Sequence, residues 1–278
     1  MPWHLGTDIG DFVAAADDYL RADPVRNTVP LSVLAGLQAS GLAAYGETPP
    51  LFGWHETAGR TDGAVLHTPP HPLLVAGFPA GSASELLARL GNAPPGSANM
   101  LDQNATEFSA AWTSVTGGRT AVHHRMRQFR LERLQPPNPA PPGAARTPGD
   151  GDVGLLISWT DAFGAETAVG AGESAREVAE WRSYGGLLLW EDAGPAAMAV
   201  LSRQVAGVCR VGTVYTPPER RKRGYGGAIT AAATQQALDA GAAEVVLYTD
   251  QANPTSNALY PRLGYRPIGD RITLDLLL

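Results

Sequence analysis

Arg221-Lys222-Arg223-Gly224-Tyr225-Gly226-Gly227 is a basic, glycine-rich stretch in the last third of the chain. It lies between a predicted strand, Val208 to Thr216, and a predicted helix whose apolar residues recur at steps of three and four up to Gly241. Glycines let the backbone approach a bulky group closely, and the start of a helix presents unpaired N–H groups and a positive dipole end. The arginines and the lysine add positive charge suited to a pyrophosphate. The stretch therefore predicts an anion-binding loop.

Other interpretations of these glycines are open. Taken alone, glycines after a strand are also typical of a tight turn. A Rossmann loop needs its spaced glycines directly after the first strand, and a phosphate loop needs a Lys-Ser/Thr pair after the glycines. Neither of these two patterns is present.

A second motif begins at Asn253. An Asn-Pro pair is typical of a helix N-cap followed by proline at the first helical position, and Gly264 predicts the end of that helix. Asn253, Asn257 and Tyr260 fall at i, i+4 and i+7, so that they share one face. A polar stripe of this kind needs a partner. Separately, the continuous apolar run Val245 to Tyr248, between the two predicted helices, predicts a buried strand.

The segment from about Gly207 to Asp270 resembles the GNAT superfamily of N-acetyltransferases. The signature of that family, Arg/Gln-x-x-Gly-x-Gly/Ala, is supplied by Arg221, Gly224 and Gly226. The helix led by Asn253, with a Tyr before a Leu-Gly-aromatic ending, is similar to the second hallmark of the family. The resemblance implies an α/β fold with a mixed α+β sheet, GNAT-like in the C-terminal domain, and an acyl-CoA-dependent N-acetyltransferase.

The resemblance also implies how acetyl-CoA, the acyl donor, is held. Backbone groups of Val214, Tyr215 and Thr216 would hold the acetyl carbonyl and the pantetheine arm. The pyrophosphate would lie on the basic loop, which comprises Arg221, Lys222, Arg223, Gly224, Tyr225, Gly226 and Gly227. Asn253 or Asn257 would contact the pantetheine chain, and Tyr260 would stand near the sulfur.

The expected chemistry is direct attack of a neutral amine on the thioester. A phenol with a pKa near 10 is roughly matched to a leaving thiolate whose pKa is about 8.5, so Tyr260 is the expected general acid, with a core aromatic as the alternative. A backbone N–H at Val214 or Tyr215 would polarise the carbonyl. No covalent nucleophile is needed, and Cys209 stands in an apolar strand, where we expect a core residue.

The general base stays unassigned. Glu191 and Asp192 follow a predicted strand, but a role in a hairpin turn is favoured for them. Glu219 is expected to be a surface partner of the arginines. We expect no metal, because His55, His67 and His71 have neither cysteines nor regular carboxylate spacing beside them.

The front half has the same predicted order of elements: three strands, a helix, a short gap, a helix and a strand. We therefore expect a tandem arrangement with a diverged, degenerate GNAT-like or accessory α/β domain at residues 1–135. A proline-rich linker at 136–151, expected as a semi-rigid spacer, precedes the GNAT domain at 152–278. The front half has one glycine, Gly81, and no basic residue at the place of the anion loop, so it would shape the acceptor cleft or a homodimer contact instead.

Charge and composition limit the partners. The formal net charge of −6 does not indicate a broad basic surface, so no nucleic-acid partner is expected. No apolar run approaches a membrane span, the N-terminus lacks the order of a signal peptide, and the single cysteine fits a reducing compartment, so we expect a cytoplasmic protein. The leading hypothesis is acetyl transfer to a primary amine of a small molecule or peptide. A non-catalytic CoA-binding module and a transferase for longer acyl-CoA are the alternatives.

Overall fold

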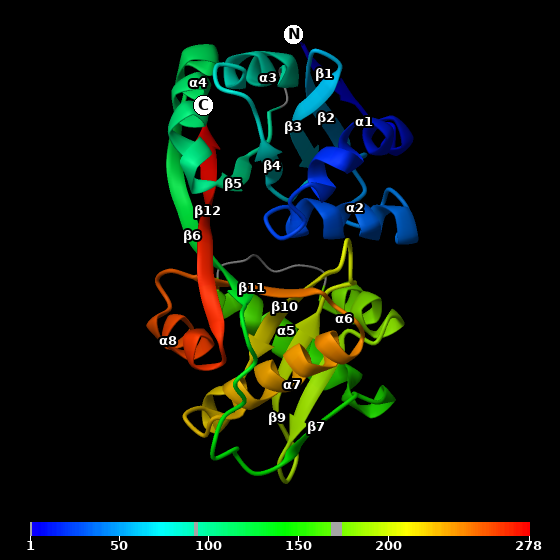
Figure 1. Cartoon of the computed structure of the whole chain (residues 1–278), viewed down its shortest axis with the longest axis vertical. Helices are drawn as coiled ribbons and strands as arrows, with labels where there is room; N and C mark the ends of the chain where they lie inside the picture. Colours follow the sequence, from blue (N-terminus) through cyan, green and yellow to red (C-terminus); the bar gives the residue numbers. More distant parts are fainter. Residues whose placement is uncertain (1, 92–93, 168–173) are drawn as a thin grey trace. The chain divides into compact units, whose positions relative to one another are not determined.

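The computed structural model of the protein describes residues 2–91, 94–167 and 174–278. The chain divides into two compact units (Figure 1). The first comprises the residues up to Arg127 together with Gly269–Leu278, and the second comprises Gln128–Ile268. Two long strands, β6 (Arg119–Leu131) and β12 (Tyr265–Leu277), pass from one unit into the other, so each unit takes part of both.

The first unit contains a mixed sheet in the order β1-β2-β3-β4-β5-β12-β6. Its remaining elements are β1 (Trp3–Gly6), α1 (Ile9–Arg21), α2 (Thr28–Ser40), β2 (Leu51–Thr57), β3 (Arg60–His67), β4 (Leu73–Gly77), α3 (Ala83–Leu90), β5 (Ser97–Leu101) and α4 (Ala105–Thr116). Alternate strand residues such as Leu73 and Val75 pack against α3 and α4, while Phe12 of α1 stacks on Phe52 of β2. A short 3₁₀ turn, Asp102–Asn104, joins β5 to α4.

The second unit contains the strand order β6-β11-β10-β9-β8-β7. Its elements are β7 (Ala144–Arg146), α5 (Val153–Thr167), α6 (Ser174–Ser183), β8 (Leu187–Glu191), β9 (Pro195–Leu201), β10 (Val208–Tyr215), α7 (Tyr225–Asp239), β11 (Glu244–Asp250) and α8 (Pro254–Arg262). Strands β10 and β11 are parallel, and the other described pairs of this unit are antiparallel.

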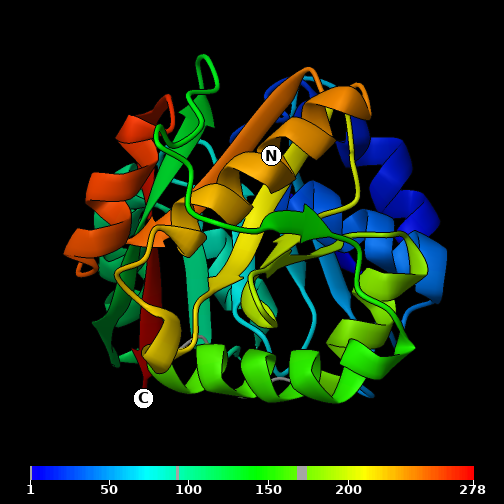
Figure 2. The same ribbon diagram turned by 90° about the horizontal axis from the view of Figure 1, so that it is seen from below.

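The sheet of the second unit is buried on both faces. Leu188 and Trp190 of β8 belong to the apolar cluster around α7, whereas Leu187 and Leu189 belong to the cluster around α5 and α6. Side chains along a strand alternate between faces, so a continuous apolar run such as 187–190 requires helices on both sides. Figure 2 shows α7 and α5 on opposite faces of the strands.

The expected helices and strands of both halves are present, and five further elements were not expected from the sequence. These are β1 and β5 in the first unit and α5, α6 and β7 in the second. Strand β12 also begins earlier than expected, at Tyr265. The mixed α/β class is confirmed, and one order of elements recurs in the two halves.

The division of the chain differs from the expected boundaries at both ends of the second half. The last ten residues, 269–278, belong to the first unit, because Arg271 to Asp275 of β12 pair with Leu101 to Ser97 of β5. Strand β12 is therefore an interior strand of the first unit. The second unit begins at Gln128, inside β6.

The proline-rich stretch 136–151, expected as a semi-rigid spacer, is part of the second unit. The indole Nε1 of Trp190 donates a hydrogen bond to the carbonyl of Pro142 at 2.9 Å, and Ala144–Arg146 pairs with β8 as strand β7. The guanidinium of Arg146 lies 2.7 Å from Asp152 and 2.9 Å from Glu191. Proline has no backbone N–H to donate, but its carbonyl can still accept a hydrogen bond. The hydrogen bond to the Pro142 carbonyl and the pairing of β7 with β8 hold this stretch against the unit.

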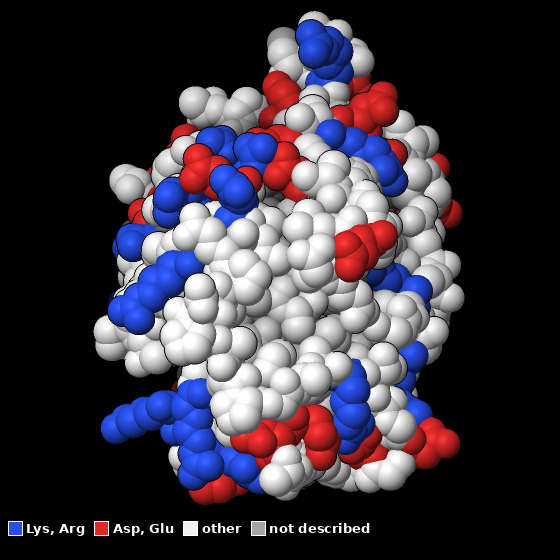
Figure 3. Space-filling view, turned by 60° about the horizontal axis from the view of Figure 1, so that its bottom comes forward, with Lys and Arg blue, Asp and Glu red and all other residues white. Residues whose placement is uncertain are grey.

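Surface charge is mixed. In Figure 3, acidic and basic side chains intersperse around a central area without charged residues, so this face has no continuous basic surface. Among residues 2–91, 94–167 and 174–278, none of the helices has the length and apolar character that a membrane span requires.

Candidate functional site

The parallel strands β10 and β11 separate toward their carboxyl ends. Their pairing runs from Val208 opposite Glu244 to Val211 opposite Leu247. Both strands continue beyond this point, β10 to Tyr215 and β11 to Asp250, without a further pair between them. The main-chain groups at the end of β10 are therefore left without a strand partner on the β11 side.

A bulge adds to this opening. Gly212 lies opposite Val200 of β9, but the next partner of β9 is Tyr215 opposite Met198, so β10 has one residue more than its neighbour here. Thr213, inside the bulge, has a positive φ of 45°. A bulge bends a strand and re-aims its backbone groups, and this one overlaps the start of the Val214-Tyr215-Thr216 segment predicted to hold the acyl group.

The predicted anion loop lies directly before α7. Gly224 is the N-cap of the helix in a left-handed conformation with a φ of 86°, and it has no side chain with which to cap. The first intrahelical bond runs from the N–H of Ala228 to the carbonyl of Gly224, so the N–H groups of Tyr225, Gly226 and Gly227 have no acceptor within the helix. Free donors at a helix start favour an anion.

The two glycines inside the helix have different roles. A Cβ at Gly227 would lie 3.2 Å from Cδ1 of Leu259 on α8, so this glycine permits α7 and α8 to approach each other. A Cβ at Gly226 would meet only the hydroxyl of Thr216, at 3.5 Å, which is an ordinary contact. Internal packing therefore does not require a glycine at position 226.

Arg221 is held in place by two other elements. Its guanidinium lies 2.7 Å from both carboxylate oxygens of Glu166 on α5, and its Nε donates to the carbonyl of Thr216 at 2.9 Å. The hydrogen bonds with Glu166 raise the pKa of Arg221. The sequence predicts a charge for the pyrophosphate here, whereas in the structure the Arg221 side chain holds the loop against α5 and the end of β10.

Lys222 and Arg223 retain more freedom than Arg221. Both side chains are exposed, and Lys222 has a left-handed φ of 62°. Arg223 makes a long hydrogen bond, 3.4 Å to the carbonyl of Glu219, and also interacts with the hydroxyl of Tyr225. These two cations are therefore the ones available to a bound anion at this loop.

The carboxylates considered as general bases are engaged elsewhere. The hydroxyl of the buried Tyr225 donates to the carboxylate of Asp192, in the turn between β8 and β9. Glu191 pairs with Arg146. Both residues therefore support the hairpin and the start of α7, as the turn interpretation predicts.

The two asparagines of α8 both stabilise the start of that helix. The Oδ1 of Asn253 accepts from the N–H of Ser256 at 3.0 Å, as an N-cap does. The Nδ2 of Asn257 donates to the carbonyls of Asp250 and Asn253, each at 2.7 Å. The remaining amide oxygen of Asn257 is buried and has no hydrogen-bond partner in the described part of the chain, so it is an unsatisfied acceptor.

Replacing Asn253 by alanine should lower the free energy of unfolding by about 1 kcal/mol, because it removes the cap of α8. The affinity for acetyl-CoA should change far less, because the capping oxygen is already engaged. Chemical denaturation gives the first quantity and titration calorimetry gives the second. A large loss of affinity with unchanged stability would contradict the capping role.

Tyr260 is almost fully buried, with 6% of its surface exposed. Its ring packs edge-on against Phe129 and Tyr265, at 5.9 and 6.3 Å between centroids, in the apolar cluster that Val214 also joins. Burial raises the pKa of Tyr260 to about 12, although a hydrogen bond with the side chain of Ser256 opposes the shift. The phenol is therefore protonated at neutral pH and can act only as a proton donor.

The other reactive side chains singled out in the sequence are buried or paired. Cys209 is 4% exposed, and burial raises the pKa of its thiol, so it is a core residue as its apolar strand predicts. His55 pairs with Asp62 at 2.6 Å, and burial lowers the pKa of both His67 and His71. Within the described residues, no cluster of three or more His, Cys, Asp or Glu side chains is arranged to hold a metal ion.

Glu166 is the residue of this site that the sequence analysis missed. It lies on α5, where Leu156, Trp159 and Phe163 recur at steps of three and four and pack on the sheet. That spacing is a helical signal. A helix predicted there would have suggested Glu166 as an acidic partner for the basic loop.

Comparisons with known proteins agree with this geometry. Residues 157–265 match the model of the acetyltransferase (GNAT) family. A search of curated protein sequences finds no match.

Three solved structures are similar over nearly the whole chain. A GCN5-related N-acetyltransferase from Sphaerobacter thermophilus has 16% identity and a TM-score of 0.63, with 98% of this chain and 94% of that chain covered. A Drosophila protein has 15% identity and a TM-score of 0.68, with 99% and 98% covered. A tandem GNAT protein from the clavulanic acid biosynthesis pathway has 13% identity and a TM-score of 0.56, with 98% and 97% covered. The chain thus has the fold of a tandem GNAT protein, and its residues 157–265 are a GNAT acetyltransferase domain.

Proposed function

We propose that the second unit transfers an acetyl group from acetyl-CoA to a primary amine of a small molecule or peptide. The observation that carries this proposal is the pairing of two features at one edge of the sheet. The strands β10 and β11 separate there, and the uncapped start of α7 follows β10 through the basic loop.

The open end of β10 suits the pantetheine arm of the donor. That arm is an extended chain with two amide groups, and an unpaired strand edge binds such a chain through main-chain hydrogen bonds. The buried amide oxygen of Asn257 would accept one of its N–H groups. Of the two asparagines that the sequence nominates, Asn257 is the one with a free acceptor.

The start of α7 suits the diphosphate. The N–H groups of Tyr225, Gly226 and Gly227 supply donors, and the exposed Lys222 and Arg223 supply charge. Arg221 acts by holding the loop against Glu166 and Thr216.

Catalysis then requires an amine, a polarised carbonyl and a proton for the departing thiolate. The amine nitrogen forms a bond to the acetyl carbon and gives up one proton to solvent, the C–S bond breaks, and the sulfur takes a proton, so that the products are an amide and a free thiol. A backbone N–H of Val214 or Tyr215 would stabilise the oxyanion, and Tyr260 would give the proton. No residue is assigned as the base, because Glu191 and Asp192 are engaged in the hairpin.

Thermal unfolding with ligands tests the donor. Acetyl-CoA at about 100 times its dissociation constant should stabilise the protein by roughly 2.7 kcal/mol, and CoA should act similarly. NAD should have no effect, because its diphosphate would lack the pantetheine contacts. Stabilisation by NAD and not by CoA would end the proposal.

Release of free thiol distinguishes an enzyme from a non-catalytic CoA-binding module. A screen of primary amines with acetyl-CoA should give amine-dependent thiol release. A longer acyl-CoA that reacts faster than acetyl-CoA with the same amine would change the donor assignment and keep the class of reaction.

A further inference from the structure

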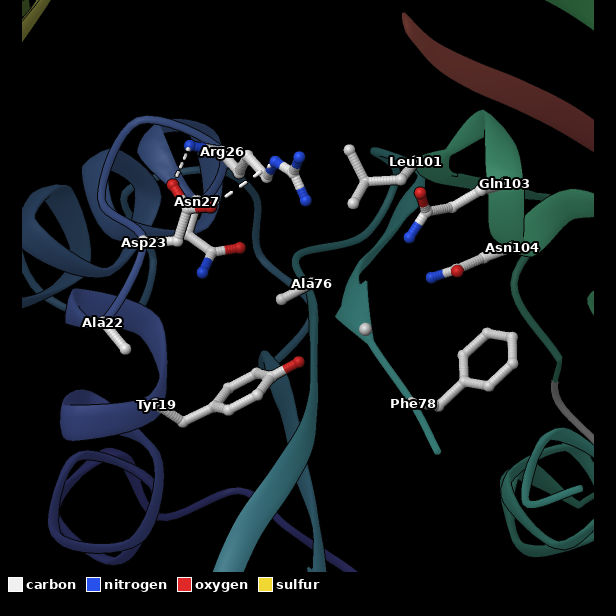
Figure 4. A pocket seen from close by; sticks show the side chains of 11 residues that line it. Tyr19, Ala22, Asp23, Arg26, Asn27, Ala76, Phe78, Leu101, Gln103 and Asn104 are labelled. Atoms are coloured by element: carbon white, nitrogen blue, oxygen red, sulfur yellow. Dashed lines mark hydrogen bonds and ion pairs between the residues drawn. The ribbon is translucent and has the colours of Figure 1, made fainter. Parts of the chain in front are cut away.

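The first unit contains a pocket of its own, at the carboxyl ends of β4 and β5. These two parallel strands pair only at Leu73 opposite Ala98 and Leu74 opposite Asn99, so their ends separate as those of β10 and β11 do. The pocket has a volume of about 310 Å³, near the lower end of the range that small-molecule sites occupy. Figure 4 shows it between the segment after α1 and the start of α4.

Three side-chain amides point into this pocket. Asn27 is 7% exposed, and its Nδ2 donates to the carbonyl of Leu20 at 3.1 Å, which leaves its oxygen directed at the cavity (Figure 4). The amides of Gln103 and Asn104 enter from the opposite wall. The side chain of Asn104 does not cap α4, although the residue is the N-cap. An amide offers both a donor and an acceptor, which is what a hydroxyl or an amide of a ligand requires.

Two aromatic rings complete the wall. Tyr19 and Phe78 line the cavity from either side of Ala76 (Figure 4). Burial raises the pKa of Tyr19, with Asp62 nearby acting in the same direction, so its hydroxyl is neutral at physiological pH. An aromatic ring beside polar groups suits a compact ligand that has both C–H faces and hydroxyl groups.

The two charged residues of the pocket neutralise each other. The Nε of Arg26 lies 3.4 Å from the carboxylate of Asp23, and the same carboxylate accepts the N–H of Arg26 at 3.1 Å. Both side chains are about half exposed and lie at the rim. The lining therefore has no net charge that would select an anion or a cation.

A phosphate group is disfavoured in this unit. The loop between β4 and α3 corresponds in element order to the anion loop of the second unit, but it lacks a basic residue. The N–H of Gly81 in that loop donates to the carboxylate of Glu107 on α4 at 2.7 Å. A carboxylate of the protein itself thus occupies a donor that a diphosphate would need, and it repels a second anion.

We propose that this pocket is a second ligand site, which binds a small uncharged molecule with several hydroxyl or amide groups, of the size and kind of a monosaccharide. Asn27, Gln103 and Asn104 would hydrogen-bond its polar groups, and Tyr19 and Phe78 would cover its apolar face. The site lies wholly within the first unit and does not depend on the transferase proposal for the second.

Titration calorimetry on the full chain tests this site with N-acetylglucosamine, which has both hydroxyls and an amide, and with glucose 6-phosphate as the anionic counterpart. We expect saturable binding of N-acetylglucosamine and weaker binding of the phosphate. The double variant Gln103→Ala/Asn104→Ala should bind the sugar roughly tenfold or more weakly, because two amide contacts are lost.

The matched control is Gln235→Ala, an exposed glutamine of α7 whose side chain hydrogen-bonds to Asp239, and it should leave sugar binding unchanged. Far-UV circular dichroism and the unfolding temperature without ligand, measured on the same variants, show whether they are folded. The absence of saturable binding in the millimolar range, or equal binding by the double variant, would overturn the site. If the unaltered protein bound the sugar but not acetyl-CoA, only the transferase proposal would be contradicted.

Discussion

The Gly226→Asp variant is expected to lose all stabilisation by acetyl-CoA, about 2.7 kcal/mol at a ligand concentration 100 times the dissociation constant of the unaltered protein. Gly226 is the second residue of α7, beside the donors proposed for the diphosphate. A Cβ fits there, 3.5 Å from the hydroxyl of Thr216, so the fold should tolerate the change. The new carboxylate would take the free N–H groups and repel the diphosphate.

The chain offers a closely matched control, Gly154→Asp. Gly154 is the second residue of α5, is exposed, and has open space where a Cβ would be placed. Both substitutions put a carboxylate at a helix start, which favours stability by about 0.3–1 kcal/mol. Only the change in α7 should abolish the response to acetyl-CoA in thermal unfolding. An undiminished response of Gly226→Asp would show that the diphosphate binds elsewhere.

Removing the hydroxyl of Tyr260 should lower turnover by a factor of roughly 10² or more, within the range of general acid catalysis. The ring stays in its apolar cluster in Tyr260→Phe, so the affinity for acetyl-CoA should be nearly intact. A phenol whose pKa is raised to about 12 stays protonated throughout the neutral range, so this loss should not depend on pH there. Steady-state rates with an identified amine, beside the dissociation constant for acetyl-CoA, measure both effects.

Tyr265→Phe is the control for that variant. Tyr265 is fully buried in the same cluster, and its hydroxyl shares a 2.6 Å hydrogen bond with Thr234. Its loss should cost about 1 kcal/mol of stability and leave turnover nearly unchanged. Equal losses of turnover in the two variants would indicate a packing effect and remove Tyr260 from the acid role.

Local sequence patterns predicted most of the second unit because its elements carry strong signals. The Asn-Pro cap of α8 and the glycines before α7 each have a conformational requirement that few residues meet, and the structure shows both requirements. Strands such as β8 are continuous apolar runs bounded by turn residues. Signals of this kind depend only on residues that are close in sequence, so they can be recognised without knowledge of the three-dimensional structure.

What the sequence did not predict depends on distant partners. Strand β5 has only five residues and owes its place to pairing with β12, more than 170 positions later. The restraint of Arg221 by Glu166 joins the basic loop to α5, 55 residues away in the sequence. The proline-rich stretch has few N–H donors of its own. It is held by distant residues, because the carbonyl of Pro142 accepts from Trp190 and residues 144–146 pair with β8.

Because β12 lies between β5 and β6, the first unit cannot close its sheet until the C-terminal residues have been synthesised. Residues 1–127 are synthesised first, but the unit that they form is complete only after β12 has been made. Arg271 of β12 then donates a hydrogen bond to the amide oxygen of Asn99. The second unit, which is contained in residues 128–268, must therefore emerge while the first is still incomplete, and its folding need not wait for that last strand. Removing the last ten residues would thus disrupt the half of the protein that is translated first.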